Sequence, residues 1–424
     1  MGLPRRLVDV IFEYLKTDRK ALLSCSLTCK AFLCSARRAI HERLYVQRPR
    51  PFQCSRGVTE WRWISDRSYL HILSLADDAG LVQYTRHIIF KVGQLLTPRS
   101  LRPHISTFQK YVWLTTLTIT RFDPTPFLPV FDRYFHHLSH SITSIHFILP
   151  RGTPYATVDF VSRFRCLDDL ELNPVMKPPR RPQSNPNSLG PHPWFTPFRG
   201  TFRIVNTDSQ RTSSLEPFLH FPGGLRFRFL EVVCCTNISM SGLIRKCSST
   251  LESVTCKLHC RKSTDRSRSS ADSRNHHSLL ALVASQNFFP ELNLGGCPEL
   301  RVFEVRIEAS SCTFWNLVGW LTRVLDTVTS RVFSRFFLSL DDTMLNLHVF
   351  EVTPETTSAL DELLARLSYR SGMRFIIKGK LSLVWRQVLG HCFPHCTGAG
   401  ALRFDFPDPD TVPLCGQGRA LRNS

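Results

Sequence analysis

Apolar residues recur at helical spacing at the amino-terminal end of the chain. Leu3, Leu7, Ile11 and Leu15 are four residues apart, which places them along one face of an amphipathic helix. Pro4 suits the first turn of such a helix, where its missing N–H is not needed. The pattern therefore predicts a first helix that begins near Pro4.

Two further short helices follow in the pattern. Thr17 or Asp18 can cap the start of the second helix with a side-chain oxygen. The apolar positions of the second stripe are Leu22, Cys25, Cys29 and Phe32, and those of a third helix near residues 35–44 are Ala36, Ala39, Ile40 and Leu44. Three short helices bury too little apolar surface to be stable alone, so we expect the remaining apolar face to bind a partner. The alternative is an ordinary three-helix bundle that packs on the rest of its own chain.

The same residues resemble the F-box of many fungal proteins. The resemblance is carried by Leu3-Pro4-x-x-Leu7, Asp9, Ile11, Tyr14-Leu15, Asp18, Leu22 and the run Cys-Ser-Leu-x-Cys-Lys-x-Phe that ends at Phe32. The family often has an acidic residue where Arg6 stands and a tryptophan where Phe32 stands.

In that family the helices bind the Skp adaptor subunit of a cullin-RING ubiquitin ligase, and the rest of the chain holds a substrate. The resemblance implies that the Skp surface is contacted by a set of mostly apolar residues: Leu3, Pro4, Leu7, Ile11, Leu15, Leu22, Cys29 and Phe32.

Short apolar triplets with the spacing L-x-x-L-x-L occupy much of the remaining chain. Clear triplets start at Leu114, Ile142, Leu167, Phe227, Leu251, Leu300 and Leu347, and weaker ones lie near residues 88–89, 202–204 and 402–406. The first three starting positions differ by 28 and 25 residues. A period in the twenties is typical of leucine-rich repeats, in which each repeat contributes one strand. This also resembles the carboxy-terminal half of many F-box proteins.

The predicted fold class is an α+β or α/β repeat: an N-terminal three-helix F-box-like module followed by an irregular leucine-rich-repeat-like solenoid. A Pro-rich loop and an Arg/Ser-rich loop should interrupt the repeats, because neither composition continues a strand. The alternative is an α/β domain whose strands merely share the spacing. The expected boundaries are 1–46 for the module, 47–80 for a helical linker, 81–380 for the array, 177–200 and 261–277 for the loops, and 381–424 for a weakly structured carboxy-terminal region.

The charge balance adds a second hypothesis. Lysine and arginine number 54 against 34 aspartate and glutamate residues, which gives a formal net charge of +20. Such a balance attracts acidic proteins and nucleic acids at long range. No RRM, KH, helix-turn-helix or zinc-finger spacing is visible, so nucleic acid is the less favoured partner. The alternative function is a basic repeat scaffold that binds nucleic acid or acidic proteins and has no ligase role.

Enzymatic and metal-binding patterns are weak. His391, Cys392, His395 and Cys396 are residue types that zinc accepts, but no second matched pair stands at finger spacing. The chain has no Gly-rich phosphate loop, nucleophile elbow or HExxH motif. We therefore expect no metal, no cofactor and no catalytic residue, as in a non-catalytic adaptor.

The sequence also bears on the compartment. It shows no amino-terminal signal pattern and no uncharged apolar run of about 18 residues, so neither export nor membrane binding is expected. The 15 cysteines are then expected to be reduced thiols in a cytoplasmic or nuclear protein. Combined with the resemblance, this predicts a substrate-receptor subunit that bridges the Skp adaptor to a protein substrate for ubiquitination and proteasomal degradation. The identity of the substrate is not readable from the sequence.

Overall fold

The computed structural model of the protein falls into two compact units, Met1–Val205 with Ser213–Leu225 and Asn206–Thr212 with Arg226–Ser424. The residues that the structure describes are 4–15, 18–47, 71–91, 104–120, 122–148, 154–173, 198–205, 216–219, 224–234, 240–258, 292–307, 314–340, 345–346 and 349–405.

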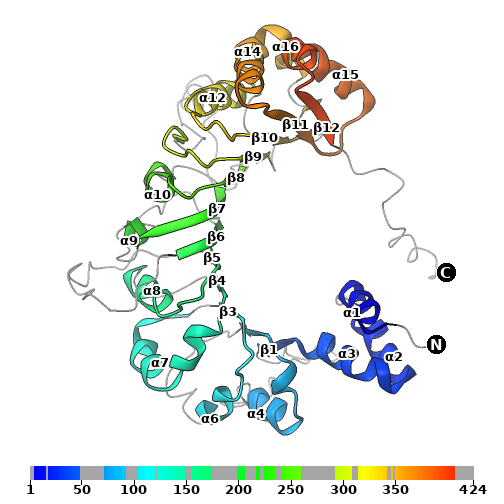
Figure 1. The fold of residues 1–424 in the computed structure, drawn as a ribbon, viewed down its shortest axis with the longest axis vertical. Coiled ribbons are helices and arrows are strands. Elements are labelled where there is room, and N and C mark those ends of the chain that lie inside the picture. The colour runs from blue at the N-terminus through cyan, green and yellow to red at the C-terminus, as the bar shows by residue number, and fades with distance from the viewer. Residues whose placement is uncertain are drawn as a thin grey trace, which may run out of the picture. The chain divides into compact units, whose positions relative to one another are not determined.

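The described strands form a twelve-stranded parallel sheet in which the strand order follows the chain order (Figure 1). The first unit holds β1 (Arg43–Gln47), β2 (His87–Lys91), β3 (Thr116–Thr120), β4 (Ser144–Ile148), β5 (Asp169–Asn173) and β6 (Phe198–Val205). The second unit holds nearly all of β7 (Leu225–Cys234), and β8 (Ser253–Leu258), β9 (Val302–Ile307), β10 (Arg335–Ser339), β11 (Arg374–Lys378) and β12 (Leu402–Asp405).

The described helices precede β1 or lie between successive strands. In the first unit they are α1 (Arg5–Tyr14), α2 (Arg19–Thr28), α3 (Lys30–His41), α4 (His71–Asp78), α6 (Ile105–Gln109), α7 (Leu128–Tyr134), α8 (Pro154–Val161) and α9 (Glu216–Leu219), with 3-10 turns at Val82–Tyr84, Thr125–Phe127 and His136–His140. In the second unit they are α10 (Met240–Cys247), α12 (Phe314–Asp326), η8 (Val349–Glu351), α14 (Pro354–Ser371), α15 (Leu383–Cys392) and α16 (Pro394–Gly398).

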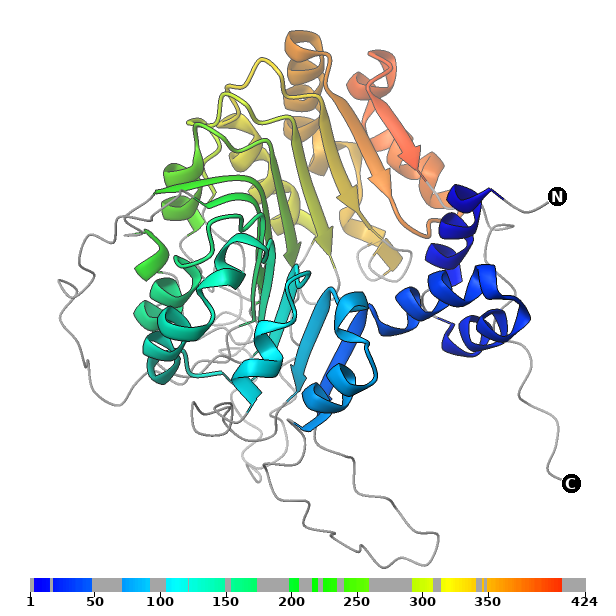
Figure 2. The same ribbon diagram turned by 60° about the horizontal axis from the view of Figure 1, so that its bottom comes forward.

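One side of the strands is buried against these helices, and the other side faces solvent. In β4 the side chains of Ile145 and Phe147 are fully buried, whereas those of Ser144 and His146 are half-exposed. The period of two arises because successive side chains in a strand point to opposite faces. Figures 1 and 2 show α7 and α8 on one side of the first unit's strands, and α12 and α14 on one side of the second unit's strands.

Aromatic side chains fill the buried side. In the second unit Phe303, Phe336 and Phe375 occupy matching positions on neighbouring strands, and their rings stack at centroid distances of 5.6 and 5.2 Å. In the first unit Phe147 and Phe160 surround Phe122 at 5.9 and 5.1 Å. Such pairs add to the stability that burial of apolar area provides. The buried triplet anchors therefore hold the helices on the sheet.

The predicted fold class is wrong. The structure is an α/β fold with one parallel sheet, as in the α/β alternative, and its described residues show no separate N-terminal three-helix F-box module followed by an irregular solenoid. The first three helices belong to the same compact unit as β1–β6. Helix α3 ends at His41, β1 begins at Arg43, and the Glu42 carbonyl between them accepts hydrogen bonds from the N–H groups of Arg86 and His87. The apolar triplets indicate which side chains are buried. The same burial pattern occurs in a leucine-rich repeat and in the parallel sheet of an α/β fold, so it does not distinguish the two.

Most triplets lie on strands, and one does not. The triplets that start at residues 114, 142, 167, 227, 251 and 300 place buried anchors on or directly before β3, β4, β5, β7, β8 and β9. The triplet at 347–352 was misread, because Phe350 lies in η8 with 95% of its side chain exposed. The strand of that region is β10, whose anchors are Phe336 and Leu338.

Several predicted boundaries moved. The third helix is Lys30–His41, and Leu44 lies on β1, because the run from Arg43 to Gln47 pairs with β2. The segment after residue 381, predicted to be weakly structured, contains α15, α16 and β12. The predicted loop 261–277 lies outside the described residues, as does 177–197, while 198–200 begins β6; of the predicted linker 47–80, only Gln47 and residues 71–80 are described.

Candidate docking surfaces

Helix α1 has an inner and an outer apolar face. Val8 and Phe12 are buried and pack with Leu22 and Ala36 of α2 and α3. Phe12 also meets the half-buried Phe32 edge to face, with ring centroids 5.8 Å apart. These contacts fix α1 against its two neighbours, because aromatic and aliphatic burial supplies most of the stability of such a small cluster.

The outer face carries a row of exposed apolar side chains, the α1 stripe, which consists of Leu7, Val10, Ile11 and Tyr14. Their spacing of three and four residues places them on one side of the helix. Leu7 is 46% exposed, Ile11 39% and Tyr14 86%. Single exposed apolar residues are ordinary on protein surfaces, but a continuous helical row of them is typical of a contact surface for another chain.

The structure divides the residues implied by the F-box resemblance into different environments. Leu7 and Ile11 lie on the α1 stripe, Pro4 is exposed before α1, and Cys29 is exposed between α2 and α3. Leu22 is buried, and Leu15 and Phe32 are half-buried against the same cluster. Leu3 lies outside the described residues. Val10 and Tyr14 complete the stripe but were not among the implied contacts, although their helical spacing from Leu7 and Ile11 was readable.

The short second helix is fixed by its first residues. The Asp18 carboxylate accepts hydrogen bonds of 3.0 Å from the backbone N–H groups of Lys20 and Ala21. This confirms the predicted N-cap, and it satisfies donors that the helix itself cannot pair. The same cap sets where α2 begins after α1 ends. The α1 stripe is thus presented by a helix whose neighbours are anchored both by packing and by a cap.

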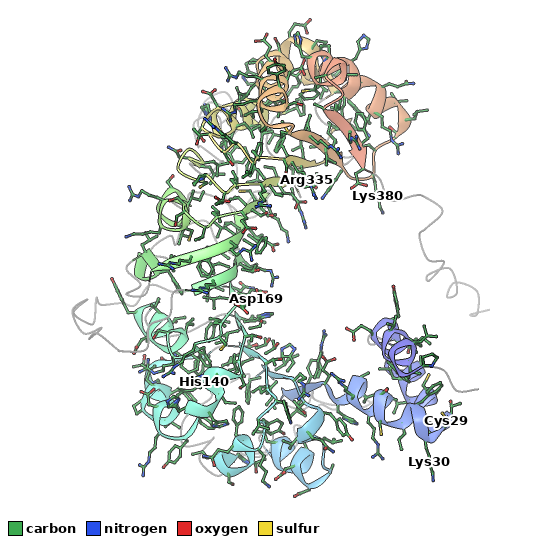
Figure 3. The ribbon with its side chains drawn as sticks, in the orientation of Figure 1. Cys29, Lys30, His140, Asp169, Arg335 and Lys380 are labelled. Carbon is green, nitrogen blue, oxygen red and sulfur yellow. The ribbon has the colours of Figure 1, made fainter. Side chains whose placement is uncertain are left out.

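A polar cluster lies on the solvent side of β2–β6 in the first unit. His146 Nε2 lies 2.8 Å from Ser144 Oγ and 3.2 Å from Asp169 Oδ2, and Arg203 Nη1 lies 3.1 Å from the same carboxylate. Burial opposes ionisation of Asp169, but the hydrogen bond from His146, the charge of Arg203 and the hydrogen bond from Ser144 together lower its pKa. Figure 3 shows Asp169 on the strands of this unit.

The cluster does not have the geometry of a serine nucleophile that is activated by a histidine base. Ser144 and Asp169 both lie at Nε2 of His146, whereas a serine nucleophile requires its carboxylate partner at the other ring nitrogen, Nδ1. The nearest acid to Nδ1 is Glu171 at 3.7 Å. His87 bonds Thr118 at 2.9 Å, and burial, with the nearby His146 and Arg43, lowers the pKa of His87 to about 4. The arrangement stabilises polar side chains on the sheet and is unsuited to acyl transfer.

The candidate zinc ligands near the carboxy-terminal end are separated by burial. Cys392 and Cys396 are buried, and burial is the main reason that the pKa of Cys392 rises to about 11 and that of Cys396 rises further. His391 and His395 lie exposed on the helices α15 and α16. Within the described ranges, no group of three or more histidine, cysteine or acidic side chains could hold a metal ion.

Cations gather on the solvent side of β9–β12 in the second unit. Arg335 and Arg374 are exposed, and Figure 3 labels Arg335 and Lys380 on the strand side of this unit. From the sequence, the positive residues were expected to be spread over the amino-terminal helices and the two loops. Their concentration here was not predicted, because the registers of β10 and β11 are needed to bring the two arginines together.

No protein-family model matches the chain, and no curated protein matches it. In the part of the chain that is described, no helix combines the length and apolarity that crossing a bilayer requires. The described surfaces that could bind a partner are the α1 stripe and the solvent sides of the strands in each unit.

Proposed function

We propose that the protein is a substrate-receptor subunit of a Skp-cullin-F-box ubiquitin ligase. In this role it binds the Skp adaptor through the α1 stripe and holds a protein substrate through the rest of its surface. The observation that carries the proposal is the exposure of Leu7 and Ile11. These two residues were implied as Skp contacts by the sequence resemblance, and 46% of Leu7 and 39% of Ile11 remain exposed on the outer face of α1.

In this role the chain acts only by bringing the substrate close to the conjugating enzyme. A receptor that binds adaptor and substrate together raises the local concentration of substrate lysines near a conjugating enzyme held elsewhere in the complex. No bond needs to be made or broken by the receptor itself.

The stripe has the chemistry of an adaptor-binding surface. Leu7, Ile11 and Tyr14 would lose their exposed apolar area in a complex, at about 25 cal/mol per Å² removed from water. Tyrosine, as at position 14, is enriched among the residues that contribute most to binding at interfaces. Because Val8 and Phe12 already hold the helix in place, the stripe is presented without folding on binding.

The proposal is tested by co-purification of the full chain with the Skp adaptor. The double variant Leu7→Asp/Ile11→Asp places two charges in the proposed contact, and we expect it to lose the adaptor, because an unpaired charge in an apolar interface is costly. Both side chains lie on the outer face of α1 and are partly exposed in the free protein, so the variant should retain its fold and its far-UV circular dichroism spectrum.

The matched control is Leu383→Asp/Val384→Asp. These two residues are exposed apolar positions at the start of α15 in the other unit, so the control introduces the same charges in the same kind of place. It should co-purify with the adaptor as the unmodified protein does. Equal recovery of the adaptor with both double variants would show that the α1 stripe does not bind the adaptor. Deleting the helices is a poorer test, because β1 follows α3 directly and pairs with β2.

A further inference from the structure

Two arginines lie next to each other on the solvent side of the second unit. Arg335 and Arg374 are paired in the register of β10 and β11, and both side chains are exposed. The position that matches them on β9 is Val302, so no carboxylate of these three strands shares their row. Strands in a sheet are about 4.8 Å apart, so the two guanidinium groups can bind neighbouring oxygens of one anionic chain.

The opposite end of the same strands also carries cations. Lys378 Nζ lies 3.6 Å from the centroid of the Phe337 ring and 3.7 Å from a Glu304 oxygen. That carboxylate is already held by Arg306 at 2.8 Å, and the exposed Asp405 is paired with Lys378 in the register of β11 and β12, so the two carboxylates offset part of the positive charge. Lys380 follows and is exposed. From Arg374 to Lys378 the strand rises about 13 Å, which an extended peptide of a few residues can span.

The backbone fixes the place of Lys380. Gly379 has φ 131°, and a Cβ atom there would lie 1.7 Å from the Leu340 carbonyl oxygen. Only glycine permits this close approach of the two chains. Lys380 therefore leaves the sheet at a defined point beyond β11, and Figure 3 shows it on the same strand side as Arg335.

The chemistry of this surface favours a polypeptide over a nucleic acid. Proteins that bind single-stranded nucleic acid combine cations with aromatic rings on which bases stack. Here the ring of Phe337 is covered by the Lys378 ammonium, and Ile376 is its neighbour on β11. Arginine forks at one end and ammonium groups at the other suit carboxylates that are spaced along an extended chain.

We propose that the solvent side of β10 and β11 binds an acidic segment of a partner protein, with Arg335 and Arg374 holding carboxylates at one end and Lys378 and Lys380 at the other. As the substrate-binding surface of a ligase receptor, this assignment rests on the proposed function. The binding itself requires no adaptor, so it is measured on the purified chain alone.

The experiment is fluorescence anisotropy with a fluorescein-labelled peptide of alternating glutamate and serine. The variant Arg335→Glu/Arg374→Glu should bind it at least about tenfold more weakly, because close charge pairs across an interface contribute strongly to affinity. The control Arg245→Glu/Arg323→Glu changes the net charge equally at exposed positions on the helices α10 and α12, and it should bind within about threefold of the unmodified chain.

The outcomes separate the alternatives. Equal weakening by both double variants would show that total charge and not this surface attracts the peptide, and it would overturn the proposal. An oligothymidylate of matched charge that binds more tightly than the peptide, and is lost in the Arg335→Glu/Arg374→Glu variant, would also overturn it in favour of nucleic acid. If the α1 variant loses adaptor binding and still binds the peptide, the two surfaces act independently, and the proposal for β10 and β11 is supported.

Discussion

Asp361 is a fully buried carboxylate of the second unit, and the structure predicts that its removal is damaging. It lies on α14 with none of its surface exposed, and its two oxygens accept hydrogen bonds from the backbone N–H groups of His395 at 2.8 Å and Cys396 at 2.9 Å. These are first-turn donors of α16, which the helix cannot pair internally. One side chain of α14 thus holds the start of α16.

The substitution Asp361→Asn keeps the size of the side chain and removes one acceptor. Its amide can accept from only one of the two N–H groups, and its own NH₂ then faces the other. A hydrogen bond to a charged group contributes about 1.5–3 kcal/mol, and an unpaired buried donor costs about 1–3 kcal/mol. Part of this loss of stability is offset, because the neutral amide does not carry the desolvation cost of a buried charge. We expect a net loss of about 2–3 kcal/mol.

Urea denaturation followed by circular dichroism measures the loss, and hydrogen exchange locates it. The amides of His395 and Cys396 should exchange up to about a hundredfold faster in the variant, because each 1.4 kcal/mol corresponds to a factor of ten. The neighbouring substitution Glu362→Gln, at an exposed position of α14, should change stability by less than about 0.5 kcal/mol. Unchanged exchange at residues 395 and 396 in Asp361→Asn would refute the reasoning.

Three further predictions concern the backbone, a histidine and the thiols. Gly379→Ala should cost more than about 2 kcal/mol in urea melts, because its Cβ would collide with the Leu340 carbonyl; stability equal to that of the unmodified chain would contradict this. The pKa of His87 is about 4 in the folded chain against 6.5 ordinarily, so the unfolded chain binds the proton more readily, and stability should fall as pH drops from about 6.5 to 4. A His87→Asn variant should lose part of that slope, and an unaltered slope would count against it. Exposed thiols such as Cys29 should react with a thiol reagent at neutral pH, while Cys247, whose pKa burial raises to about 12, should react only after unfolding, as mass spectrometry would show.

Local features were readable from the sequence where a short pattern has a single physical meaning. A cap by Thr17 or Asp18 was predicted, because their side-chain oxygens can accept from the first N–H groups of a helix, and Asp18 provides it. The triplet that starts at Ile142 located β4, because its alternating positions are buried. The β10 strand was missed because the pattern was matched at Leu347 instead, and spacing alone does not tell which apolar run is buried.

The α1 stripe was predicted in part, and the error has a geometric cause. Residues four apart drift by about 40° around a helix at each step, because a turn holds 3.6 residues. The predicted row from Leu3 to Leu15 therefore crosses from the outer to the inner face. Leu7 and Ile11 remain outside, while Leu15 packs against the cluster of Val8 and Phe12.

The cationic surface could not be predicted at all from residue order. Arg335 and Arg374 are separated by a whole strand-to-strand connection, and only the register of β10 and β11 makes them neighbours. The role of Asp361 is of the same kind, because its partners at residues 395 and 396 belong to a different helix. Contacts between distant segments depend on the topology, which the triplets described only as separate strands.

The central claim is that the α1 stripe binds the Skp adaptor, and titration of purified adaptor into the purified full chain by calorimetry measures this directly. We predict saturable binding that changes little between low and high salt, because the contact is apolar, and that disappears in Leu7→Asp/Ile11→Asp. Absence of heat with the unmodified chain, or binding that falls steeply with salt and survives the substitutions, would contradict the account.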